Sequence, residues 1–116
     1  MNTGPQNRFS VYSIWQDIYR AICEDFEKNK MLVPSYRSPI SEGCLKWLER
    51  IGDAILINDM KEINVCLYNI AHYSTEPIEA FNNGRMPGAK EDFLKPYYEF
   101  NQAYLMLSAL LEDTLS

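Results

Sequence analysis

Cysteine and histidine side chains are the strongest nucleophile and base candidates of this 116-residue chain, and they are few. Three cysteines, Cys23, Cys44 and Cys66, accompany a single histidine, His72. A catalytic cysteine needs its thiolate held beside a base. Cys66 and His72 are closest in sequence, but six helical residues turn the second side chain by about 600° and raise it by about 9 Å, so the two diverge. The fold can still bring His72 to Cys23 or Cys44, and that alternative stays open.

The more ordinary interpretation of these four residues is structural. Each cysteine belongs to a helical apolar row or borders one, where a free thiol behaves as a small buried hydrophobe. We therefore expect all three cysteines to be reduced and mostly buried. His72 lies near the expected end of a helix, where an imidazole complements the helix dipole.

Metal ligands at useful spacing are also sparse. No CxxC pair occurs, so a zinc site of the usual kind is not expected. A two-metal site in a helical bundle needs Glu-x-x-His on two helices, yet Asn69 precedes His72 by three residues and there is no second histidine. Glu49 and Asp53 share one helical face, where paired carboxylates hold metals or move protons but more often are solvated charges. We predict no metal and no cofactor.

The charge distribution argues against nucleic acid and membranes as partners. The net charge is −5, and residues 59–116 hold all of it, with nine acids against four bases. An acidic half repels phosphate backbones and anionic lipid, although it also serves solubility alone. The segment FNNGRMPGAK has glycines and a lysine but lacks the phosphate-loop pattern and follows no strand. A helix-turn-helix role is disfavoured, because a recognition helix needs more cations than the third helix offers.

Apolar residues recur at helical spacing throughout, and no alternating run of useful length occurs. The fold class is therefore all-α: a compact bundle of four longer helices plus one short helix, in a single domain over 1–116 with a flexible N-terminus at 1–9. The expected helices cover about 10–29, 41–57, 59–73 and the short segment 76–82, followed by a last helix after the loop at 83–90.

Local signals place several helix ends. Asp59 with Glu62 forms a capping-box pattern that opens the third helix. Pro77 is tolerated in a first turn, and Asn83–Gly84 suits a left-handed cap, so we expect a separate short helix between them. Gly52 stands in the middle of a helix at a cost of about 1 kcal/mol relative to Ala, which indicates close approach of a neighbouring helix.

The last helix has an aromatic and leucine seam whose members are spaced 4-3-4-3-4: Phe93, Tyr97, Phe100, Tyr104, Leu107 and Leu111. This period is also the period of a coiled coil, so the seam fits self-association. We expect it to face the core instead, because the other helices each have one apolar stripe that needs a common neighbour. Pro96 should start this helix or kink it.

The compartment is expected to be cytoplasmic. The sequence MNTGPQNRFS has no apolar run behind a basic region, and no apolar stretch of 18 residues occurs. An odd number of cysteines without a disulfide framework agrees with a reducing compartment.

These exclusions favour a non-enzymatic, acidic protein-binding module. Our best hypothesis is an inhibitor or immunity-type protein that neutralises a basic toxin or nuclease, because an acidic surface speeds encounter with a cationic cleft. The alternative is a helical adaptor or self-associating accessory protein, such as a homodimer, joined through the seam of the last helix. A small enzyme using His72 and a cysteine is a third class. We predict a partner-binding rim on both sides of the loop 83–90, formed by carboxylates around one arginine: Glu76, Glu79, Arg85, Glu91 and Asp92.

Overall fold

Four long helices alternate in direction along the chain in a computed structural model that describes residues 8–115. They are α1 (Arg8–Asn29), α2 (Pro39–Leu56), α3 (Met60–Asn82) and α4 (Lys95–Leu115). Two 3-10 turns, η1 (Pro34–Arg37) and η2 (Glu91–Leu94), precede α2 and α4. No strand occurs between residues 8 and 115, so the predicted all-α bundle of four longer helices is confirmed.

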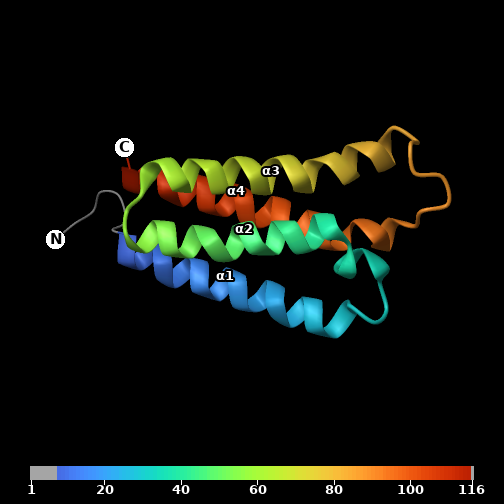
Figure 1. The fold of residues 1–116 in the computed structure, drawn as a ribbon, viewed down its shortest axis with the longest axis horizontal. Coiled ribbons are helices and arrows are strands. Elements are labelled where there is room, and N and C mark those ends of the chain that lie inside the picture. The colour runs from blue at the N-terminus through green and yellow to red at the C-terminus, as the bar shows by residue number, and fades with distance from the viewer. Residues whose placement is uncertain (1–7, 116) are drawn as a thin grey trace.

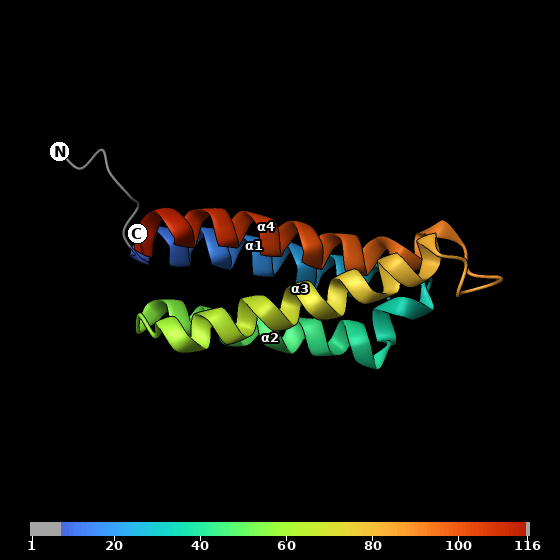
Figure 2. The same cartoon turned by 90° about the horizontal axis from the view of Figure 1, so that it is seen from above.

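Each helix lies beside two others in the bundle. α1 packs between α2 and α4, and α3 packs between α2 and α4 on the opposite side (Figure 1; Figure 2). The tight α2–α3 turn lies at the same end as the start of α1 and the end of α4. The other end, here called the loop end, carries the connections 30–38 and 83–94.

The core takes one row of side chains from each helix. The row of α4 is most of the predicted seam: Tyr97, Phe100, Leu107 and Leu111 are buried, and Tyr104 is half-buried against the core. Phe93, the first residue of the predicted seam, lies before α4, in η2, and is half-buried. The intramolecular interpretation of the seam is thus confirmed, and the seam is not available as a surface for self-association. In the described part of the chain, no helix is both long and apolar enough to cross a membrane.

The prediction for α1 is wrong at the start of the helix and confirmed at its end. Arg8 and Phe9, which we expected in a flexible N-terminus, belong to the helix. Residues 1–7 lie outside the described part of the chain. The helix ends at Asn29, as predicted.

α2 starts two positions earlier than expected, because a serine before it caps the helix. Ser38 is the N-cap, and its hydroxyl accepts the Ser41 backbone N–H at 3.1 Å. Pro39 occupies the first helical position, where its missing N–H is not needed. The predicted loop before α2 therefore ends at Ser38, and part of it forms the turn η1.

The predicted capping box of α3 is half formed. Asp59 Oδ1 accepts the backbone N–H of Glu62 at 3.1 Å. The backbone N–H of Asp59 instead donates to Ala54, because the α2–α3 turn closes on it. The Glu62 carboxylate accepts from Arg50 on α2, so it joins two helices rather than closing the box.

The predicted end of the third helix near Tyr73, with a separate short helix from Glu76, is wrong. α3 continues through Pro77 to Asn82. Its buried row keeps helical spacing across the proline, and that packing offsets the hydrogen bond that proline removes. The row consists of Ile63, Cys66, Ile70, Ser74 and Pro77.

The glycine cap that we placed after the short helix closes α3 instead. Gly84 has a φ of 72°. Its N–H donates to Phe81 at 3.1 Å, and the N–H of Arg85 donates to Ala80 at 2.9 Å. This pair of bonds is the Schellman motif, which satisfies the last carbonyls of a helix.

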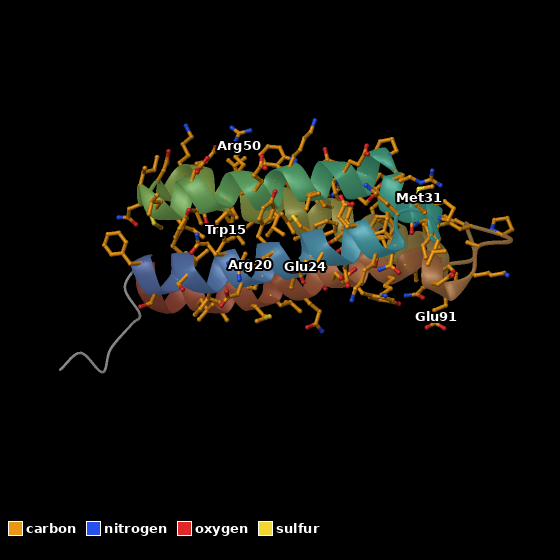
Figure 3. The ribbon with its side chains drawn as sticks, turned by 90° about the horizontal axis from the view of Figure 1, so that it is seen from below. Trp15, Arg20, Glu24, Met31, Arg50 and Glu91 are labelled. Atoms are coloured by element: carbon orange, nitrogen blue, oxygen red, sulfur yellow. The ribbon has the colours of Figure 1, made fainter. Side chains whose placement is uncertain are left out.

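The close approach predicted at Gly52 is confirmed, and the neighbour is a tryptophan of α1. The Trp15 indole lies between α1 and α2, and its Nε1 donates to the Leu48 carbonyl at 2.7 Å (Figure 3). A Cβ on Gly52 would lie 2.6 Å from Trp15 Cε2 and closer still to two other ring carbons. A glycine is therefore required where the indole rests.

Candidate functional site

The cysteines do not form a nucleophilic site. Cys44 and Cys66 are buried, Cys23 is half-buried, and all three are free thiols. Burial raises the pKa of Cys44 to about 12 and that of Cys66 to about 11. Both thiols stay protonated near neutral pH, whereas nucleophilic attack needs a thiolate. The prediction of reduced, buried cysteines is confirmed for Cys44 and Cys66 and only partly for Cys23.

His72 is a surface residue in the middle of α3. The helix continues for ten residues beyond it, so its expected role at a helix C-terminus is wrong. The ring stacks on Tyr68 with 5.8 Å between centroids, and its Nε2 lies 3.5 Å from Glu76 Oε2. Within residues 8–115, no three His, Cys, Asp or Glu side chains gather to hold a metal ion.

Glu49, considered as half of a carboxylate pair with Asp53, contacts α1. The Tyr19 hydroxyl donates to Glu49 Oε2 at 3.0 Å. This bond joins α1 and α2 on their outer side, so Glu49 has a structural partner.

The five residues predicted as one rim are divided between two surfaces. Glu76 and Glu79 line a hollow of about 330 Å³ on the outer side of α3, together with His72. Glu91 and Asp92 line a larger groove between α1 and α4. Arg85 is exposed on the loop, and it forms no ion pair with a carboxylate of the described residues.

The groove between the first and last helices, here called the α1/α4 groove, has a volume of about 720 Å³ and is open to solvent. Its floor and walls are mainly apolar: Ile18, Ala21 and Ile22 from α1, and Tyr98, Ala103 and Met106 from α4. Its polar groups are Glu91, Asp92, Lys95, Glu99 and Gln102. Because Glu91 and Asp92 belong to η2, the charge concentrates at the loop end (Figure 3).

A cluster of three side chains from three elements lies at this end of the groove. Tyr36 of η1 donates its hydroxyl to Glu99 Oε2 of α4 at 2.6 Å. The Glu99 carboxyl group also hydrogen-bonds the carboxyl group of Asp25 on α1. We call these residues the Asp25–Tyr36–Glu99 cluster.

The surroundings of the cluster favour the protonated form of Glu99. Burial raises the pKa of Glu99 to about 7, the bond with Asp25 raises it as well, and the bond donated by Tyr36 opposes both. The same bond with Glu99 lowers the pKa of Asp25. The two carboxyl groups therefore share one proton, with Glu99 as its donor and Asp25 as the carboxylate. Lys95, also in the groove, favours the charged forms of both groups.

Sequence analysis missed this cluster, because its carboxyl groups stand 74 positions apart in the chain. A signal for it exists in the two helical rows. Asp25 and Glu99 each directly precede a core phenylalanine, Phe26 and Phe100, whose rings pack with centroids 5.6 Å apart. Because Phe26 and Phe100 pack against each other, Asp25 and Glu99 lie at the edge of the same core layer, where they meet.

The arrangement can hold a cation and accept or release one proton. Besides the acidic residues, the only polar side chains among residues 8–115 that line the groove are the Lys95 amine, the Gln102 amide and the Tyr98 phenol. Comparison of the chain with protein-family models, with curated proteins and with solved structures finds no match.

Proposed function

We propose that this chain is a non-enzymatic module that binds a basic protein, and that it acts as an inhibitor of the immunity type on a basic toxin or nuclease. The observation that carries the proposal is the α1/α4 groove, whose apolar floor ends at Glu91, Asp92 and Glu99. An apolar centre with a charged margin is the usual composition of a protein interface.

The charge of the chain supports a basic partner over an acidic one. At −5, the chain attracts a cationic protein over a long range at low salt. Carboxylates at the groove can also take the place of the phosphates that a nuclease binds. Affinity would come from the apolar floor, and speed of encounter from the charge.

The test uses the product of the gene adjacent to the gene of this chain. Expressed alone, this product should arrest growth of a host cell, and co-expression of the chain should restore growth through a one-to-one complex. A neighbouring product that is harmless, or that is toxic without forming this complex, would contradict the inhibitor hypothesis.

Matched charge variants connect that test to the surface. Reversing both charges at the groove, Glu91→Lys with Asp92→Lys, should reduce rescue and slow association. The control, Glu76→Lys with Glu79→Lys, makes the same change of charge in the hollow of α3. Equal loss of rescue in both variants would show that net charge alone is responsible.

Self-association is the second candidate, and it has an observation of its own. The outer side of α4 exposes Leu105 by 57%, beside the groove residues Tyr98 and Met106, which are exposed by 43% and 48%. Because the seam is buried, a homodimer would have to use exposed apolar side chains such as these. Sedimentation over a range of concentrations separates the two candidates, since an inhibitor of the proposed kind is a monomer alone.

A further inference from the structure

We propose that the α1/α4 groove is the docking site for a basic amphipathic helix of the partner protein. The apolar face of that helix would lie on the groove floor, and its cations would meet Glu91 and Asp92 at the loop end. This inference rests on the proposed function, because it names the segment of the partner that the groove receives.

A helix suits the groove better than an extended strand does. The two walls are helices, whose backbone N–H and C=O groups are already paired within each helix, so no edge is offered to a strand. The residues of the α4 wall run from Lys95 to Met106, which is about 16 Å or three helical turns. Ala21 and Ala103 keep the middle of the groove low, so bulky side chains of another helix can enter.

The charges select a basic occupant. Two carboxylates, Glu91 and Asp92, line the groove against one amine, Lys95, and Glu99 is a third acidic group that loses its proton near pH 7. A second copy of this chain would bring the same carboxylates and the same net charge of −5, so like charges would oppose the pairing. An uncharged apolar molecule would gain nothing from Glu91 and Asp92, which are exposed to solvent.

The test uses the full chain and a synthetic peptide of about 18 residues that forms an amphipathic helix with leucines on one face and lysines and arginines on the other. A control peptide has the same composition in an order without an apolar face. We expect one-to-one binding of the first peptide by fluorescence anisotropy, weakened as salt rises from about 50 to 200 mM. The control peptide should bind far less.

Two neighbouring positions on α4 provide matched variants. Met106 lines the groove and is 48% exposed, whereas Leu105 lies outside it and is 57% exposed. Met106→Arg should weaken peptide binding about tenfold or more, and Leu105→Arg should leave it nearly unchanged. Ala21→Arg, on the opposite wall, repeats the test if Met106→Arg disturbs the helical circular dichroism spectrum.

Four results would overturn the inference. Equal binding of both peptides would show attraction by charge alone. Equal loss in Met106→Arg and Leu105→Arg would place binding on the outer side of α4. A dimer of the chain that Met106→Arg dissociates would make a second copy the occupant. Rescue of the host cell without peptide binding would leave the proposed function standing and move the docking site elsewhere.

Discussion

The first helix meets its two neighbours in opposite ways. On the side of α2, the Trp15 indole rests on Gly52 and donates to the Leu48 carbonyl, so the two helices are in close contact. On the side of α4, Ala21 and Ala103 are too small to fill the space between the helices, and an open groove remains. Both interfaces are apolar, but the first is closed at Trp15 and opens only further along, where a hollow of about 630 Å³ lies between Tyr19 and the first half of α2.

This difference indicates how the bundle divides its tasks. A closed seam with a large aromatic residue contributes stability, since buried aromatic area is large. An open apolar groove adds little to stability, and it leaves surface that a partner can bury. Trp15 on the α1/α2 side therefore contributes to the stability of the fold, and the α1/α4 side presents the candidate site.

The strongest way to break this comparison is to remove the tryptophan. Trp15→Ala should lower the free energy of unfolding by about 3–5 kcal/mol, because it leaves a cavity over Gly52 and removes a hydrogen bond. Ala21→Leu, in the groove, should change it by less than about 0.5 kcal/mol. Urea unfolding monitored by circular dichroism measures both. Similar losses in the two variants would contradict the division between the two sides.

Two glycines of α2 sharpen the comparison within a single helix. Gly52→Ala should cost about 1–3 kcal/mol, because the new methyl group overlaps the Trp15 ring. Gly43 has no foreign atom within 4 Å of the place where a Cβ would lie, so Gly43→Ala should gain about 0.5–1 kcal/mol from helix propensity.

Thermal unfolding of the two glycine variants should therefore shift in opposite directions. If Gly52→Ala were neutral, the indole would have room to move, and the α1/α2 seam would be looser than its contacts indicate. If Gly43→Ala were destabilising, helix propensity would not be the main influence on stability at that position.

The sequence was sufficient to predict the four long helices and, for most of them, the side that faces the core. The helical period of the apolar residues and the positions of turn residues predicted the bundle, the buried seam of α4 and the close approach at Gly52, because these features depend on local spacing. The same local rules misplaced the end of α3. Pro77 ends an isolated helix, but here packing of its buried ring against the bundle continues the helix.

The candidate site was less accessible to sequence analysis for a physical reason. The predicted rim assumed that carboxylates flanking one loop lie near one another, yet α3 and η2 direct them to two surfaces. The Asp25–Tyr36–Glu99 cluster comes from three separate elements. Its members meet through tertiary packing, and the sequence shows only that Asp25 and Glu99 each precede a core phenylalanine.

The smallest expected effect tests the loop end of the α1/α4 groove through its shared proton. The pKa of Glu99 is raised to about 7 in the fold from an ordinary value of 4.5, so the folded chain binds more protons than the unfolded chain between these pH values. The free energy of unfolding should therefore fall as the pH rises through this window. Lys28 and Asp25 from α1, Tyr36 from η1 and Lys95 from α4 are the groups that set this balance.

Glu99→Gln keeps an amide that can donate to Asp25 and an oxygen that can accept from Tyr36, but it has no proton to lose. The unmodified chain loses stability as the pH rises from 4.5 to 7.5, and the variant should not. The difference in the free energy of unfolding should therefore shift in favour of the variant by on the order of 1 kcal/mol across this range, allowing for screening by solvent. Glu49→Gln removes a carboxylate from the α1/α2 side and is the matched control. Urea unfolding at several pH values decides the matter. Parallel pH profiles for Glu99→Gln and the unmodified chain would mean that the groove end holds no shared proton, and the contrast between the two sides of α1 would then be one of packing alone.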